Sequence, residues 1–234
     1  MYITKALKRH RFPVSIIGHL VWLYHRFNNS YLDIQEQMEY RGIFLSHETV
    51  RAWCYKFASS FQEVIRKRER KPKDKLDEMN VKINGEVFIL RKAVDSDGYK
   101  LEVLLQKRRN KKSGIRFLIR LLGNYLVPRV IVTDKLRSYI KPIRHMCPKA
   151  DYRSHKALNN RVENAHQPTR RKEKILIKFK SPQGVQKTLS LMGKVRNIFA
   201  VDVGRYTKTA QEQRNAFAIA KSIWDEANLR LLVA

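Results

Sequence analysis

The stretch DEMNVKINGEVFILRKAVDSDGYKLEVLLQ, residues 77–106, determines the fold class of this chain. Its composition and its alternating apolar residues are those of three β-strands separated by two turns. Asn84 and Gly85 supply the positive φ angles that a type I′ turn requires, and residues 95–98, Asp-Ser-Asp-Gly, are typical of a second turn. The stretch therefore predicts three antiparallel strands, with Asp77 at the start of the first.

The segment that follows predicts a helix and then a fourth strand. Residues 113–126, SGIRFLIRLLGNYL, have the period of an amphipathic helix, and residues 128–134, PRVIVTD, predict a short buried strand that ends in Asp134. Helical patterns follow it. The order of strands and helices predicts an α/β fold, in which helices flank a mixed sheet and a site forms at strand ends. The same order is found in the ribonuclease H fold.

Residues 14–65 predict helices only. Ser30 is placed to cap the second helix, Gly42 to end it, and Ser46 to cap the third. A short helix, a turn containing glycine and a second helix form the helix-turn-helix pattern, although a plain helical hairpin packed in a core has the same pattern. If the pattern is a helix-turn-helix, the start of the helix that follows Ser46 faces DNA. The residues expected to contact DNA there are His47, Glu48, Arg51 and Lys56.

Changes in composition divide the chain into four parts. A run of mixed charge with one proline, RKRERKPKDK, separates the helical part from the strands and is typical of a solvated linker. The predicted parts are an all-α helix-turn-helix domain at 1–65, a basic linker at 66–75, the α/β domain at 76–210 and a C-terminal helix at 211–234.

The charge of the chain predicts a polyanionic partner. Among 234 residues, 49 are Lys or Arg and 21 are Asp or Glu, which gives a formal net charge of +28. Nucleic acid is the polyanion that such an excess favours. An RNA-binding structural protein is disfavoured, because no aromatic RNA-binding motif is present. Cys54 and Cys147 have no zinc-ligand spacing, and no apolar run is long enough for a transmembrane span or signal peptide, so we expect an intracellular, cytoplasmic protein.

Three carboxylates lie at positions from which they could bind metal ions together. Asp77 and Asp134 lie on strands that the layout makes neighbours, and Glu163 lies in the basic helical segment NNRVENAH, residues 159–166. Three carboxylates brought together repel one another unless divalent cations lie between them. Two Mg²⁺ ions, with Mn²⁺ as a substitute, would suit a phosphodiester displacement. By spacing alone the triple is weak evidence, and a surface counter-charge explains Glu163 equally well.

Six motifs follow one another along the chain: FPVSIIGHLVWLYHRF, SYLDIQEQMEYRGIFLSHETVRAWCYKF, DEMNVKINGEVFILRKAVDSDGYKLEVLLQKRRN, PRVIVTDKLRSY, NNRVENAHQPTRR and FKSPQGVQ. In these motifs and their order, the chain resembles the DDE transposases of bacterial insertion sequences, IS-six type, from about Phe12 to about Phe199. The resemblance implies a helix-turn-helix domain that recognises the terminal inverted repeats of the element. It also implies a ribonuclease-H-like catalytic domain whose DDE triad is Asp77, Asp134 and Glu163. Family members catalyse Mg²⁺-dependent cleavage of the element's ends and strand transfer into target DNA.

The resemblance also implies roles for basic residues near the triad. His166 would assist near the scissile phosphate, or it is a helix-face histidine with local hydrogen bonds. Arg170 and Arg171 would contact DNA, and Lys135 would either pair with a phosphate or be solvated. Because transposition holds two DNA ends together, a homo-oligomer on DNA is expected, associated with the bacterial nucleoid.

Two features depart from the family pattern. Asp77 is followed by Glu-Met-Asn, where the family usually has Glu-Thr-Tyr, and only 28 residues separate Asp134 from Glu163, fewer than usual. A shortened loop would be harmless, whereas a shortened helix or strand would misplace Glu163. The alternative to an active enzyme is therefore a catalytically impaired, transposase-derived DNA-binding protein.

Overall fold

The computed structural model describes residues 7–8, 10–68, 74–95, 99–108, 110–133, 137–154, 160–176, 179–200 and 209–232. At residues 74–75, 77, 137–138, 154 and 160–165 it describes the backbone alone. The chain forms two compact units. Unit one contains Met1–Glu69 and Lys194–Ala234, and unit two contains Arg70–Gly193.

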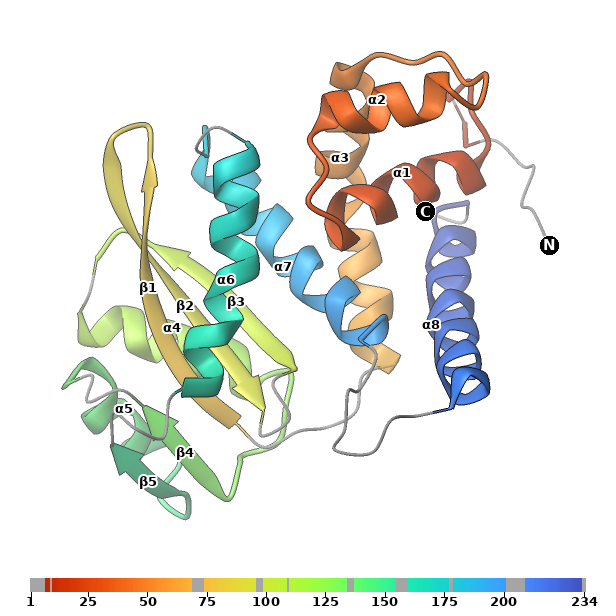
Figure 1. Ribbon diagram of the computed structural model, residues 1–234. Coiled ribbons are helices and arrows are strands. Elements are labelled where there is room, and N and C mark those ends of the chain that lie inside the picture. The colour runs from red at the N-terminus through yellow and green to blue at the C-terminus, as the bar shows by residue number, and fades with distance from the viewer. Residues whose placement is uncertain are drawn as a thin grey trace. The chain divides into compact units, whose positions relative to one another are not determined.

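Unit one is helical, as the sequence predicts. Its helices are α1 (Val14–Arg26), α2 (Tyr31–Glu39), α3 (His47–Arg68) and α8 (Ala210–Arg230), shown in Figure 1. The predicted cap at Ser30 is present as a reciprocal pair: the Ser30 hydroxyl accepts from the Asp33 amide at 3.1 Å, and the Asp33 carboxylate accepts from the Ser30 amide at 2.7 Å. Gly42 adopts a positive φ of 73° in the turn after α2. The Ser46 hydroxyl accepts from the Thr49 amide at 3.3 Å, which caps α3.

Helix α8 packs against α1 and α3, a placement that the sequence analysis did not predict. The ring of Trp224 stacks on that of Phe61 with centroids 4.3 Å apart, and its indole N–H donates to the Gly18 carbonyl at 3.2 Å. These contacts join residues at opposite ends of the chain. Unit one is therefore built from two segments separated by the whole of unit two.

Unit two contains a five-stranded mixed sheet with the order β3-β2-β1-β4-β5. The first three strands are antiparallel, as predicted, and Asn84 and Gly85 form the left-handed turn between β1 and β2, with φ angles of 49° and 82°. Strand β4 runs parallel to β1, and β5 runs parallel to β4. The strands are β1 (Asp74–Ile83), β2 (Glu86–Asp95), β3 (Lys100–Gln106), β4 (Val130–Thr133) and β5 (Asp151–Ser154).

Two details of the sheet differ from the prediction. Strand β1 begins at Asp74, so Asp77 lies within the strand and not at its start. Strand β5 was not predicted, because only helices were expected after β4. Its four residues, Asp-Tyr-Arg-Ser, have no apolar alternation, and they form a strand by pairing with β4 at the sheet edge.

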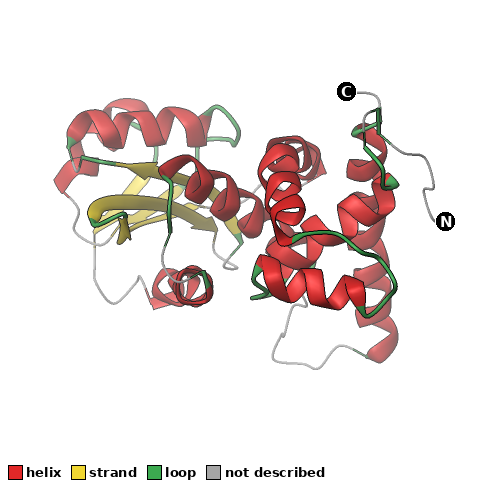
Figure 2. Cartoon of the chain, turned by 90° about the horizontal axis from the view of Figure 1, so that it is seen from above, coloured by secondary structure: helices red, strands yellow, loops and turns green. Residues whose placement is uncertain are grey.

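Helices cover both faces of the sheet, as Figure 2 shows from above. Helices α4 (Lys111–Leu122) and α5 (Arg137–Met146) cover one face, where Leu76, Phe117 and Tyr139 are fully buried. Helix α6 (Asn160–Ile175) and the first part of α7 (Pro182–Ile198) cover the other, above a second apolar cluster. The strand order, strand directions and flanking helices together form the ribonuclease-H-like α/β core that the sequence predicts. The second cluster is Met79, Val81, Ile83, Leu90, Val103, Phe179, Val185, Leu189 and Met192.

In the ranges that the structure describes, every helix is too short or too polar to cross a membrane.

Candidate active site

Strand β1 carries the first predicted carboxylate position and lies beside β4, which ends at Thr133. The two strands are parallel, with Lys75 paired to Val132. Asp77 lies on β1, two residues after Lys75, and its backbone is described. Asp134 falls outside the described residues; in the sequence it comes two residues after Val132.

Helix α6 carries the third predicted position. Glu163 lies in the first turn of α6, which begins at Asn160, and α6 packs against β1. The structure describes the backbone at Glu163 and not its side chain. The elements that hold Asp77 and Glu163 are therefore in contact, while the placement of the carboxylates stays a prediction.

A buried hydrogen bond joins α6 to the sheet beside these positions. Lys92 on β2 is the antiparallel register partner of Asp77. Its side chain is 1% exposed, and its ammonium donates to the hydroxyl of Thr169 on α6 at 2.7 Å. Lys172, one turn further along α6, is also fully buried. Lys92 was not predicted as a site residue, although a lysine within the apolar run FILRKAV was a signal.

The opposite face of the sheet contains a buried ion pair. Glu78 and Arg91 are register partners, and their side chains, 4% and 0% exposed, form a salt bridge. The Arg91 guanidinium also lies over the ring of Tyr139 on α5, 4.7 Å from its centroid, and donates to Gln106 at 2.8 Å and Ser113 at 3.0 Å. This network, which the sequence analysis also missed, attaches α4 and α5 to the strands next to Asp77.

Comparison with known proteins decides the family. A family model described as a DDE domain matches residues 73–201, more than half of the chain. A transposase for the insertion sequence-like element IS431mec from Staphylococcus aureus (strain N315) is 31% identical over 163 residues, which cover 67% of this chain and 73% of the relative. The chain belongs to the DDE transposases of bacterial insertion sequences, IS-six type. The predicted family is thus confirmed.

Two further comparisons give a second transposase and a solved integrase domain. The transposase for the element IS257 in transposon Tn4003 from S. aureus is also 31% identical to this DDE transposase over 163 residues, with the same coverage. Among solved structures, the catalytic core domain of HTLV-2 integrase in complex with magnesium has 15% sequence identity and a TM-score of 0.43. That match covers 58% of this chain and 90% of the integrase domain.

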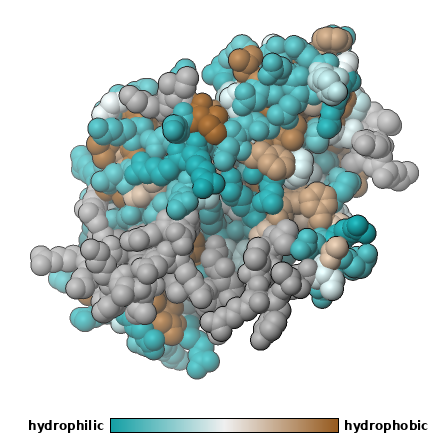
Figure 3. Space-filling model, in the orientation of Figure 1, coloured by the Kyte–Doolittle hydropathy of each residue, from teal (hydrophilic) through white to brown (hydrophobic). Residues whose placement is uncertain are grey.

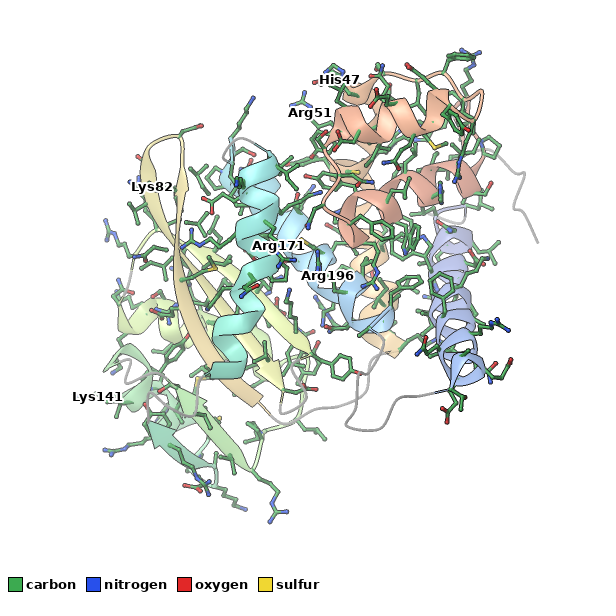
Figure 4. All side chains as sticks on the ribbon, in the orientation of Figure 1. His47, Arg51, Lys82, Lys141, Arg171 and Arg196 are labelled. Carbon is green, nitrogen blue, oxygen red and sulfur yellow. The ribbon has the colours of Figure 1, made fainter. Side chains whose placement is uncertain are left out.

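Two of the arginines that the resemblance assigns to DNA lie exposed on α6 of the transposase, and Figure 4 labels one of them, Arg171. Arg170 forms an ion pair with Glu173 at 3.0 Å, and Arg171 donates to Gln167 at 3.5 Å. His166, on the same helix, is half-buried. Lys135 lies outside the described residues.

The start of α3 presents the residues that the sequence assigned to DNA recognition. His47, Glu48, Arg51 and Lys56 are all exposed, and Figure 4 shows His47 and Arg51 at this end of unit one. The Glu48 carboxylate accepts from the Arg51 Nε at 2.8 Å and lies 3.6 Å from the His47 ring nitrogen. Tyr55, one turn beyond Arg51 and 44% exposed, extends the same face and was not predicted.

The predicted metal ligands all fall outside the side chains that the structure describes. Among the described residues no three His, Cys, Asp or Glu side chains gather into a metal site. Cys54 and Cys147 are both buried. In Figure 3 most of the visible described surface is hydrophilic, as the charge of the chain implies.

Proposed function

We propose that this DDE transposase binds the terminal inverted repeats of its insertion sequence, cleaves the element's ends with divalent metal and joins them to target DNA. The observation that carries the proposal is the parallel pairing of β1 with β4 beneath a helix, α6, that packs on β1. Those three elements bear Asp77, Glu163 and, directly after β4, Asp134. Position 77 also belongs to the same alternate set along β1 as Met79 and Val81, which pack in the cluster on the α6 and α7 face.

The donor set of the proposed site fits Mg²⁺. Asp77, Asp134 and Glu163 would hold the metal through oxygen atoms, the ligands that Mg²⁺ prefers, with Mn²⁺ as a substitute. A pair of such ions supplies activation of the attacking oxygen and neutralisation of charge on the leaving oxygen. His166, three residues after Glu163, would hydrogen-bond near the scissile phosphate, and the basic residues would bind the DNA backbone around it. Those basic residues are Lys135, Arg170 and Arg171.

The elements retained within the short interval between Asp134 and Glu163 favour an active enzyme over an impaired one. Its described residues still form α5, with Tyr139 and Ile143 buried against the sheet, and β5, which pairs with β4 over four residues. The interval therefore retains a packed helix and an edge strand between β4 and α6. This observation supports a harmless shortening of loops.

If the protein is an active transposase, the purified protein nicks and joins DNA strands. We expect cleavage at the element's ends when the protein is incubated with Mg²⁺ or Mn²⁺ and DNA that carries both ends, because the proposed carboxylates need a divalent ion. Gel analysis of labelled strands measures it, with EDTA and an Asp134→Ala variant as controls. Specific binding of the ends without nicking or joining by the unsubstituted protein would instead support the impaired DNA-binding protein.

Replacing Arg51 with alanine is expected to weaken binding of the inverted repeat by about 10- to 100-fold, since a well-placed arginine–base contact is worth about 1–3 kcal/mol. Fluorescence anisotropy with repeat and scrambled DNA measures the loss, which we expect to be larger for the repeat. The matched control is Arg116→Ala, an arginine on α4 of unit two. Equal losses for both DNA sequences would show that Arg51 contacts phosphate alone.

We further propose that the transposase acts as a homo-oligomer on DNA in the bacterial nucleoid. Two ends must be held together during transposition, and recognition helices commonly act in symmetric pairs. The exposed start of α3 leaves its recognition face available for such an arrangement.

A further inference from the structure

A lysine lies buried in the middle of the sheet of unit two. Lys92 shares the α6 and α7 face of β2 with Leu90, which lies two residues away in the apolar cluster on that face. An ammonium group withdrawn from water is costly unless hydrogen bonds compensate it. One such bond is the 2.7 Å contact with Thr169, whose side chain is itself only 1% exposed. The sequence thus places a charged donor where an apolar residue would pack at lower cost.

The Lys92–Thr169 hydrogen bond connects two of the elements that bear the proposed triad. Lys92 lies directly opposite Asp77 in the antiparallel register. Thr169 lies on α6, six residues after Glu163. Helix α6 continues from Glu163 through Pro168 to Thr169, so a shift of the helix at Thr169 also moves Glu163.

We propose that Lys92 is a positioning residue of the DDE site, which holds α6 in register over β1 and so sets the distance between Asp77 and Glu163. The inference rests on the proposed function. It assigns Lys92 no contact with DNA or metal; its effect passes through Thr169 and α6. An error of about 1 Å at a reacting centre costs about 100-fold in rate, so a single buried hydrogen bond at this place has a large effect on cleavage.

The test compares Lys92→Met with Lys82→Met. Both substitutions remove a lysine charge from the same sheet, but Lys82 lies exposed on β1 and makes no proposed contact with the site. We expect Lys92→Met to lower the rate of strand cleavage about 100-fold. In the absence of DNA, Mn²⁺ binding is measured by the increase in melting temperature. We expect the Mn²⁺ concentration that gives half of the maximal increase to rise at least about tenfold in Lys92→Met. Lys82→Met should leave the cleavage rate per bound DNA and the Mn²⁺ concentration unchanged.

Substitutions of Thr169 decide the matter even when Lys92→Met fails to fold. Thr169→Val removes the hydroxyl with little change of shape and should reproduce both effects. Thr169→Ser keeps the hydroxyl, so its cleavage rate and its Mn²⁺ concentration should stay at the unsubstituted levels. Cleavage and Mn²⁺ binding at unsubstituted levels in Thr169→Val would overturn the proposal. Failure of the unsubstituted protein to cleave DNA would count against the proposed function instead, and the Mn²⁺ comparison would still decide the role of Lys92.

Discussion

Replacing Glu163 with glutamine is expected to reduce strand cleavage by at least about a thousandfold while DNA binding is retained. The amide keeps the size of the side chain and removes the negative charge that the metal requires. Loss of metal-assisted charge stabilisation costs several kcal/mol, and each 1.36 kcal/mol is a factor of ten in rate. Single-turnover cleavage of saturated, end-labelled DNA measures the chemical step separately from binding.

Glu173→Gln is the matched control for this result, because it makes the same chemical change ten residues further along α6. Glu173 pairs with the exposed Arg170, so the single-turnover rate should stay within about threefold of the unsubstituted rate, since a helix ion pair with one exposed partner contributes little. Cleavage by Glu163→Gln at a similar rate would exclude Glu163 from the triad. In that case the shortened interval after Asp134 would have displaced the third carboxylate.

Replacing Arg91 with methionine is expected to lower the free energy of unfolding of unit two by about 3–5 kcal/mol, because it leaves the buried Glu78 carboxylate without its counter-charge. It also removes the contact with the Tyr139 ring. Hydrogen exchange of the β1 and β2 amides under native conditions measures the change. Tryptophan fluorescence would not, because Trp22, Trp53 and Trp224 all belong to unit one.

Lys107→Met provides the comparison with an exposed pair. Lys107 bonds to Glu86 at 2.9 Å with both side chains largely exposed, so its loss should cost less than about 1 kcal/mol.

The double variant Glu78→Gln with Arg91→Met should be less destabilised than the sum of its two single variants, since neither charge is then left alone. Additive losses would show that the pair is not coupled.

Local signals in the sequence predicted much of the fold. The Asn84-Gly85 turn fixed the first hairpin, and Ser30 and Ser46 fixed helix starts, because each acts through hydrogen bonds or φ angles within a few residues. Strand β5 and the packing of α8 were not predicted. Both depend on partners distant in the chain, such as Gly18 for Trp224, and no local pattern specifies them.

For the site, the sequence indicated the three carboxylates but not the buried basic residues on the neighbouring strand. Asp77, Asp134 and Glu163 were found from motif order and family resemblance. Arg91 and Lys92 were missed because charged residues in a strand are usually taken as exposed. Two adjacent charges within one apolar run must point to opposite faces of the strand, so a sheet covered by helices on both faces buries both of them.

The two-segment construction of unit one has a consequence for synthesis on the ribosome. Helix α3 emerges early, but Phe61 has no ring to stack on until α8 has followed. The roughly 140 residues between Arg68 and Ala210 take on the order of ten seconds to translate. Within that time the whole of unit two is synthesised. A chain whose proposed DNA-recognition helices are fully packed therefore already contains the strands and the helix that carry the proposed catalytic positions.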